Sequence, residues 1–138
     1  MKKAITTGLP DAKGPIERAI LAGRTLYTTA SPTKADGTTE KGSAAKQATL
    51  TLSNLARILK AAGGSMADVT QAMLYVTDRR FIAPITKVWA KAFSRPYPNR
   101  ATVIVKGIGL PGAKLVIMAQ ARIPKAGKRS RKRRSGTD

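Results

Sequence analysis

The sequence predicts a single α+β domain in which two helices cover one face of a mostly antiparallel β-sheet. Three observations predict this fold class: two stretches with apolar residues at intervals of three and four, several short β-branched runs around them, and a length of 138 residues that suits one domain. We expect the domain to span residues 1–124 and to be followed by a basic, disordered tail over residues 125–138. Because the strands are apolar, we expect the second face of the sheet to be covered, most economically by self-association.

The N-terminal part of the chain is predicted to hold an edge strand and a β-hairpin. Residues 4–7 have a weak strand pattern and precede a run of turn residues. Residues 16–22 and 25–30 are short apolar runs on either side of Gly23, which is the arrangement of a tight hairpin. Residues 31–42 are rich in Pro, Gly, Thr and Asp, and we expect a loop there.

Two amphipathic helices are predicted, with a buried strand between them. The first begins after an N-cap at Gly42-Ser43 and ends at Gly63-Gly64. The second spans residues 81–94, where Pro84 is tolerated only within the first turn. Residues 69–77 are rich in branched and aromatic residues and apolar on both faces, as in a central strand. The apolar stripes, which we assign to core packing, are Ala45, Ala48, Leu52, Leu55, Leu59 and Ala62 in the first helix and Ile85, Val88, Trp89, Ala92 and Phe93 in the second.

Two further strands are predicted near the C-terminus, at residues 101–105 and 115–119, joined by a loop rich in Gly and Pro. Arg100 opens the first of them. Side chains alternate across a strand, so Arg100 and Thr102 share one face. A guanidinium held rigidly at a strand end can receive a planar anion through two parallel hydrogen bonds, and the alternative is a solvated surface charge.

The residue inventory restricts the chemistry. The chain contains no cysteine and no histidine, which excludes disulfides, thiol nucleophiles, imidazole bases and metal sites built on thiolate or imidazole. We expect no metal ion and no cofactor, and any proton transfer must use a carboxylate, Tyr, Lys or water. No apolar run approaches the roughly 20 residues that span a bilayer, and no signal peptide follows Met1. We therefore expect a cytoplasmic protein without membrane contact.

The chain is strongly basic, with 26 Lys and Arg against 7 Asp and Glu and a formal net charge of +19. Residues 125–138 carry six of these net charges, so most of the excess belongs to the domain. Such a charge favours contact with RNA or another polyanion, although the tail has no aromatic residues to stack on bases and can equally be a solvated extension. The candidate nucleic-acid-binding residues of the tail are Lys128, Arg129, Arg131, Lys132, Arg133 and Arg134.

The motifs around the C-terminal strands carry a further signal. They are Pro98-Asn99-Arg100-Ala101, then Leu110-Pro111, then the strand at residues 115–119. In this order they resemble the C-terminal signature of the Rid (YjgF-type) family of enamine/imine deaminases. The similarity extends over about residues 13–122 and includes Gly14-Pro15, Leu26-Tyr27-Thr28-Thr29 before Pro32, Ala61-Ala62-Gly63 and Val76-Thr77-Asp78 in matching order.

The resemblance implies a chorismate-mutase-like fold that assembles as a homotrimer, with sites in the clefts between subunits. In that family the arginine of the Pro-x-Arg motif, here Arg100, holds the carboxylate of a reactive 2-imino or enamine acid. Water attacks the imine carbon and ammonia leaves. The small-molecule partner implied for this chain is therefore a carboxylate.

The residues that assist proton transfer in the family are largely replaced in this chain. Following the last strand from Leu110-Pro111, the family's glutamate falls on Met118, which can neither accept nor donate a proton. The tyrosine after Gly-Pro is Ile16, the serine of the hairpin strand is Thr29, and an asparagine common in the second helix is Thr86. Only Thr29 keeps a comparable hydroxyl group.

Two nearby side chains are candidates for the missing acid. Gln120 shares a strand face with Met118 and can orient water, but it does not titrate. Glu17 follows Ile16, and on a continuous strand its side chain would point the opposite way. We therefore expect a site in which Thr29 is the catalytic hydroxyl and the substrate-binding residues are Arg100, Thr102, Met118, Gln120 and Ile16.

Two functional hypotheses from different classes follow. The first is a Rid-type hydrolase in which Arg100 clamps the carboxylate, Thr29 and backbone groups position water, and solvent moves the proton. Such an enzyme would be slow, since general acid and base assistance is typically worth about 10²- to 10⁴-fold. The second is a binding protein without turnover, either for a small carboxylate or, as a translation-inhibitor-type protein, for RNA through its basic surface and tail.

Overall fold

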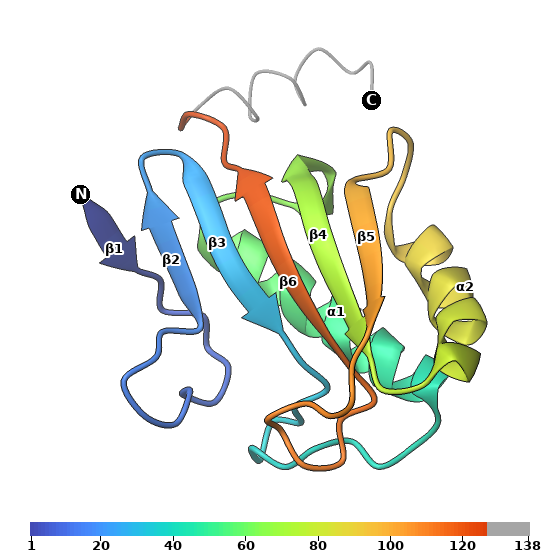
Figure 1. Ribbon diagram of the computed structural model, residues 1–138. Coiled ribbons are helices and arrows are strands. Elements are labelled where there is room, and N and C mark those ends of the chain that lie inside the picture. Colours follow the sequence, from blue (N-terminus) through green and yellow to red (C-terminus); the bar gives the residue numbers. More distant parts are fainter. Residues whose placement is uncertain (127–138) are drawn as a thin grey trace.

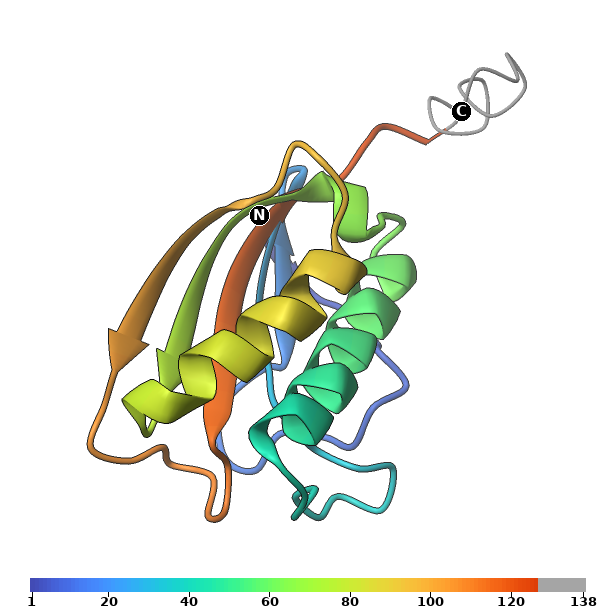
Figure 2. The same cartoon turned by 90° about the vertical axis from the view of Figure 1, so that its right-hand side faces the viewer.

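The computed structural model describes residues 1–126 and shows two helices packed on one side of a six-stranded sheet (Figures 1 and 2). The predicted α+β fold class is confirmed. The candidate nucleic-acid-binding residues of the tail, Lys128 to Arg134, lie outside the described residues. The elements are β1 (Lys2–Ala4), β2 (Ala19–Ala22), β3 (Thr25–Ala30), α1 (Ala44–Ala61), β4 (Val69–Val76), α2 (Ile82–Ala92), β5 (Asn99–Ile104) and β6 (Leu115–Arg122), with 3₁₀ turns at Met66–Asp68 and Arg79–Phe81.

The strands lie in the order β1-β2-β3-β6-β4-β5. All neighbouring pairs are antiparallel except β4 and β5, which run parallel. A parallel pair needs a long crossover connection, and α2 supplies it. This connection places α2 on the same face as α1 and leaves β5 as the outermost strand (Figure 1).

The N-terminal hairpin is confirmed, but its first strand is shorter than predicted. β2 begins only at Ala19 and pairs with β3 around Gly23, which adopts a φ of +61° that glycine tolerates best. The preceding residues form a loop, which Arg18 fixes by donating hydrogen bonds from Nε and Nη2 to the carbonyl of Pro10, at 3.0 and 2.6 Å. The edge strand likewise lies at Lys2–Ala4 rather than at residues 4–7.

Both ends of α1 are capped as the sequence predicted. The Oγ of Ser43 accepts a hydrogen bond of 3.2 Å from the backbone N–H of Lys46. At the other end Gly63 adopts a φ of +88°, and its N–H donates to the carbonyl of Lys60 at 3.0 Å. The bond at Ser43 begins the helix, and the bond at Gly63 ends it.

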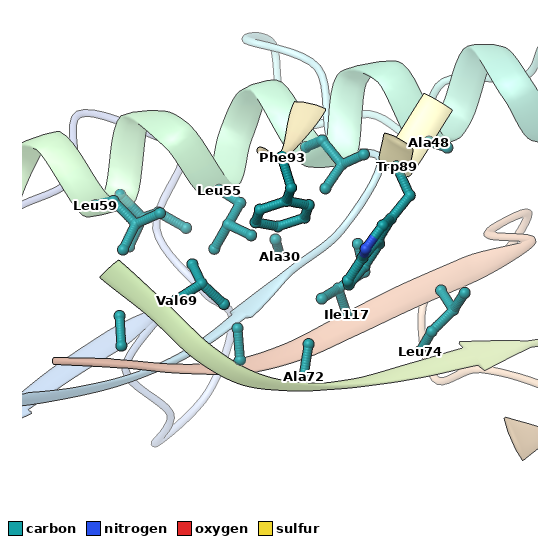
Figure 3. Packing of buried hydrophobic residues seen from close by; sticks show 14 of the residues in the cluster. Ala30, Ala48, Leu55, Leu59, Val69, Ala72, Leu74, Trp89, Phe93 and Ile117 are labelled. Atoms are coloured by element: carbon teal, nitrogen blue, oxygen red, sulfur yellow. The ribbon is translucent and has the colours of Figure 1, made fainter. Parts of the chain in front are cut away.

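The hydrophobic core lies between the two helices and the sheet (Figure 3). Leu55 from α1 and Ile117 from β6 are completely buried in it. Trp89 of α2 and Phe93, the residue after this helix, pack with ring centroids 4.7 Å apart, and each is only 5% exposed. The assignment of these two aromatic residues to the core is confirmed.

α1 also buries polar side chains that its apolar stripe did not predict. Gln47 is completely buried, and its Nε2 donates to the carbonyls of Glu40 and Gly112 at 2.7 and 3.0 Å. Its Oε1 accepts a hydrogen bond of 2.8 Å from the N–H of Lys114. One amide group therefore joins the loop before α1 to the loop before β6 and satisfies three backbone groups.

The opposite face of the sheet carries no helix in either view, and we call it the open face (Figures 1 and 2). Successive residues of β6 alternate between the two faces: Ile117 is buried, whereas Met118 is 47% exposed. Met73 and Tyr75 of β4 are only half-buried on this side. Nothing within the described residues covers the open face, so its coverage by self-association stays a prediction.

Candidate functional site

Arg100 stands at the second position of β5, at the edge of the sheet. It pairs in register with Ala72 of β4, which is buried beneath the helices, so its side chain leaves the sheet on the helix-covered face. The guanidinium lies over the ring of Trp89, with Cζ 4.9 Å from the ring centroid. Its Nη2 donates a hydrogen bond of 3.1 Å to Oγ1 of Thr86. Helix α2 thus holds Arg100 by an aromatic ring and a hydroxyl group.

The charge of Arg100 is partly desolvated. Burial lowers the pKa of Arg100 below its ordinary value because the cation loses hydration, yet a guanidinium remains charged at neutral pH. The ion pairs within residues 1–126 join Lys46 to Glu40 and Arg80 to Asp78, and neither involves Arg100. Its remaining N–H donors are therefore available to an external anion.

Thr102 lies two residues further along β5, where it pairs in register with Leu74. Leu74 is completely buried on the helix-covered face, so Thr102 and Arg100 share that face, as the alternation of the strand predicted. Thr102 is half-buried beside the core. Thr102 can therefore line a site beside Arg100 on β5.

The remaining predicted site residues gather on the open face. Thr29 of β3 lies directly opposite Met118 of β6, and Tyr27 lies opposite Gln120 in the same pair of strands. These four side chains are exposed and line one hollow, together with Glu17 from the loop before β2. The hollow is lined by the apolar side chain of Met118, the hydroxyl group of Thr29 and the carboxylate of Glu17.

Ile16 lies beside this hollow rather than in a strand. Its side chain is 64% exposed and lines an adjoining depression with Thr29, Glu17 and the loop that contains Leu110 and Pro111. The two depressions share Glu17, Arg18 and Thr29. The structure therefore brings Ile16, Thr29 and Met118 to one region of the open face.

The register of β4 shows that the two groups of site residues do not meet within one chain. Arg100 pairs with Ala72, whereas Met118 pairs with the next residue, Met73. Because adjacent residues of a strand point to opposite faces, Arg100 and Met118 lie on opposite faces of the sheet. One chain presents an anion-binding side chain at its edge and a partly apolar hollow on its open face.

Sequence reasoning missed two features of this arrangement. The first is Glu17, which strand alternation places away from the site if residues 16–22 form one continuous strand. β2 begins at Ala19, so strand alternation does not apply to Glu17, and Glu17 lines the hollow with Thr29. The second is Trp89, which is a core residue as predicted but also supports the guanidinium of Arg100.

Two kinds of feature are absent from residues 1–126. They contain no cluster of three or more acidic side chains that could hold a metal ion. Neither of the helices in this part of the chain is long and apolar enough to cross a membrane.

Comparison with known proteins connects this geometry to a family. The family model described as "Endoribonuclease L-PSP" matches residues 6–123. The "2-iminobutanoate/2-iminopropanoate deaminase" of Bos taurus is 31% identical over 111 residues, which cover 78% of this chain and 81% of that protein. The "RutC family protein y4sK" of Sinorhizobium fredii is 34% identical over 116 residues, or 83% of this chain and 91% of that protein.

Solved structures share the fold over most of the chain. The crystal structure of E. coli TdcF with bound serine superposes with a TM-score of 0.80 at 30% identity and covers 88% of this chain and 99% of that one. RidA from an Antarctic Psychrobacter superposes with a TM-score of 0.81 at 29% identity, again over 88% and 99% of the two chains. Both the sequence motifs and the fold agree with these relatives. The chain therefore belongs to the Rid (YjgF-type) family, whose family model carries the description Endoribonuclease L-PSP.

Proposed function

We propose that this protein binds a small 2-imino or enamine carboxylate and hydrolyses it to the 2-keto acid and ammonia. The observation that carries the proposal is the guanidinium of Arg100, which is oriented by Thr86 and Trp89 and has no carboxylate partner within residues 1–126. A planar cation fixed in this way matches a planar carboxylate. Relatives named 2-iminobutanoate/2-iminopropanoate deaminase support the choice of substrate class.

The complete site, in this proposal, forms between two copies of the chain in a homotrimer. Arg100 and Met118 lie on opposite faces of one sheet, so a second copy must supply one of the two walls. The open face also exposes large side chains, with Met118 at 47% and Tyr27 at 45%, that a partner subunit would cover. The edge strand β5, which carries Arg100, would then border the neighbouring copy's hollow.

Each predicted residue receives a role in this cleft. Arg100 binds the substrate carboxylate, with Thr102 lining the strand beside it. Thr29 of the neighbouring copy positions the attacking water through its hydroxyl group, and Gln120 orients water further out. The apolar wall that surrounds the substrate's side chain is formed by Met118 and Ile16.

The proposal is tested by following the loss of 2-iminopropanoate, generated in place by an amino-acid oxidase, with and without the purified protein. We expect Arg100→Ala to abolish the acceleration and Arg100→Lys to retain only a small part, because an ammonium group cannot form the paired contact. Arg95→Ala is the matched control, since Arg95 also lies over an aromatic ring, with Cζ 5.9 Å from the Tyr97 centroid, but is exposed. It should retain full activity.

Two results would overturn the proposal. One is a decay of 2-iminopropanoate that is no faster with the protein than in buffer. The other is an acceleration that Arg100→Ala leaves intact, because the carboxylate would then be held elsewhere or not at all. Analytical ultracentrifugation of the same samples tests the assembly, and a monomer at micromolar concentration would exclude a cleft between copies.

A second candidate function is the binding of RNA, as in a translation-inhibitor-type protein. The observation that favours it is the helix layer, since neither α1 nor α2 contains an acidic residue. The charged side chains of the two helices are therefore all basic, which favours contact with a polyanion. The exposed basic residues of the two helices are Lys46, Arg57, Lys60, Lys87 and Lys91.

Binding of a single-stranded RNA oligomer at increasing salt tests this candidate. We expect the affinity to fall steeply with salt, to fall again when Lys60 and Lys91 are changed to glutamate, and to be unaffected by Arg100→Ala. Removal of residues 125–138 measures how much the tail contributes to the affinity for RNA. Affinity that does not respond to these helix changes would exclude the helix layer as the RNA-binding surface.

A further inference from the structure

The hollow that contains Thr29 and Met118 also contains a carboxylate from a different part of the chain, Glu17. We propose that Glu17 carries out the proton transfers of the hydrolysis and so replaces the acid that Met118 lacks. This inference rests on the proposed imine hydrolysis. It assigns the reaction's proton carrier to the loop before β2 instead of the last strand.

The local structure holds Glu17 in position from both sides. On its N-terminal side the N–H of Ile16 donates to the carbonyl of Gly14 at 2.8 Å, which closes a tight turn. On its C-terminal side the carbonyl of Arg18 accepts a hydrogen bond of 2.7 Å from Oγ1 of Thr28, a buried residue of β3. Thr28 is adjacent to Thr29, so the loop is attached to the strand that forms the wall of the hollow.

The carboxylate of Glu17 is not neutralised within the described part of the chain. The neighbouring guanidinium of Arg18 is turned to the carbonyl of Pro10, with hydrogen bonds of 3.0 and 2.6 Å. The ion pairs within residues 1–126 do not include Glu17. Its side chain is exposed at the rim of both depressions and is therefore accessible to water and substrate.

The chemistry needs one group that first takes and then gives a proton. Water adds to the carbon of the imine, whose nitrogen is protonated, and the carboxylate of Glu17 accepts a proton from that water. The C–O bond forms and the imine nitrogen becomes an amine. The resulting carboxylic acid then protonates the amine, and the C–N bond breaks to release ammonia. The hydroxyl proton passes through solvent to the ammonia, which leaves the ketone and an ammonium ion.

This assignment separates the two binding tasks in the cleft. Arg100 fixes the carboxylate end of the substrate, and Thr29 and Glu17 act on water at the imine carbon. Met118 then needs no acid–base chemistry and serves as an apolar contact. In this arrangement Glu17 supplies the acid–base group that the family's glutamate would provide at the position of Met118.

The test compares Glu17→Gln with Asp11→Asn, using loss of 2-iminopropanoate as the readout. Both changes remove one negative charge from the same loop, but Asp11 does not line the hollow that contains Met118. We expect Glu17→Gln to lower kcat by about 10²-fold or more with KM changed little, and Asp11→Asn to stay within about two-fold.

Other charged and ionisable groups face the same region. Asp11, Lys13 and Arg18 line the adjoining depression, and Arg18 and Tyr27 line the hollow itself. The loss of kcat is assigned to Glu17 only if it occurs in Glu17→Gln and not in Asp11→Asn.

A rescue experiment sharpens the result. In the Glu17→Gln background, Met118→Glu adds a carboxylate to the same hollow. We expect the kcat of this double variant to be at least about ten-fold higher than that of Glu17→Gln alone. If Glu17→Gln is as active as the unchanged protein while Arg100→Ala is inactive, the role of Glu17 is overturned and the proposed hydrolysis stands. If the unchanged protein is itself inactive, both proposals are overturned.

Discussion

The two faces of the sheet differ in what their residues do, and β6 shows the difference within two neighbouring positions. Ile117 points toward the helices and is completely buried, whereas Met118 points away from them and is 47% exposed. One face of the strand therefore determines the stability of the domain, and the other determines what can bind. A change of chemistry at position 118 is possible because the fold does not depend on it.

Arg100 is the exception, because it belongs to the helix-covered face but lies at its edge. There the core ends, and Trp89 offers an aromatic face to a cation instead of to another apolar group. The covered face thus contributes to the site as well as to stability. Trp89, which is part of the core, also supports the guanidinium, and the exposed Thr86 accepts its hydrogen bond.

The largest effect that tests this comparison is expected from truncating the two neighbouring residues of β6. Ile117→Ala should lower the free energy of unfolding by about 2–5 kcal/mol, because it leaves a cavity in the core. Met118→Ala should cost less than about 1 kcal/mol, since its side chain is half exposed in the single chain. Urea denaturation at protein concentrations where the chain is monomeric measures both. Equal losses would show that the two faces do not differ as described.

A second pair of changes makes the same comparison for polar residues. Gln47→Ala leaves two backbone carbonyls and one N–H without their partner in the interior, and we expect it to cost about 3 kcal/mol. Gln120→Ala makes the same chemical change on the open face, where the side chain is exposed, and should cost less than about 0.5 kcal/mol. Thermal unfolding of both variants checks the difference. A stable Gln47→Ala protein would mean that water replaces the amide.

A third prediction concerns the edge where the faces meet. Thr86→Ala removes the hydrogen bond to Nη2 of Arg100, and we expect the affinity for pyruvate, used as a stable keto carboxylate, to fall about five-fold, which corresponds to one hydrogen bond of about 1 kcal/mol. Thr49→Ala is the control, because Thr49 is an exposed helix residue whose hydroxyl bonds only within its own helix, to the carbonyl of Ala45. Titration calorimetry measures both. Identical affinities would show that Thr86 does not orient the guanidinium.

The sequence predicted the parts of the fold that depend on local contacts. Ser43 and Gly63 were identified as the ends of α1, because capping uses backbone groups within one turn. The buried role of Gln47 was not predictable, because its partners include Gly112 and Lys114, which lie more than sixty residues away. The predicted length of β2 was wrong for a different reason, since Arg18 lies in a loop and bonds to Pro10, eight residues earlier in the chain.

For the candidate site, the sequence predicted which residues share a face of one strand but not how the faces of different strands are arranged. Alternation correctly places Arg100 and Thr102 on one face of their strand. It does not fix whether that face is also the face of Met118, because the answer depends on the register of both strands with β4. Glu17 was missed because strand alternation was applied to a residue that lies in a loop.

The smallest effect is expected where neither face of the sheet buries the side chains, at the turn between β4 and α2. Hydrogen bonds from Arg80 lower the pKa of Asp78 from 3.8 to about 2. A lowered pKa in the folded state means that this pair stabilises the protein above pH 3.8 and that its contribution disappears as the pH falls toward 2. The stability of Asp78→Asn should therefore depend slightly less on pH in that range, with little difference at neutral pH beyond the weak effect of an exposed ion pair. Arg80→Ala should have a smaller effect of the same sign on the pH dependence, because the backbone N–H of residue 80 still donates to Asp78. Urea denaturation at a series of pH values measures both. If either variant keeps the pH dependence of the unchanged protein, the ion pair between Asp78 and Arg80 contributes nothing to stability. The stability of the turn between β4 and α2 would then come from burial on the helix-covered face.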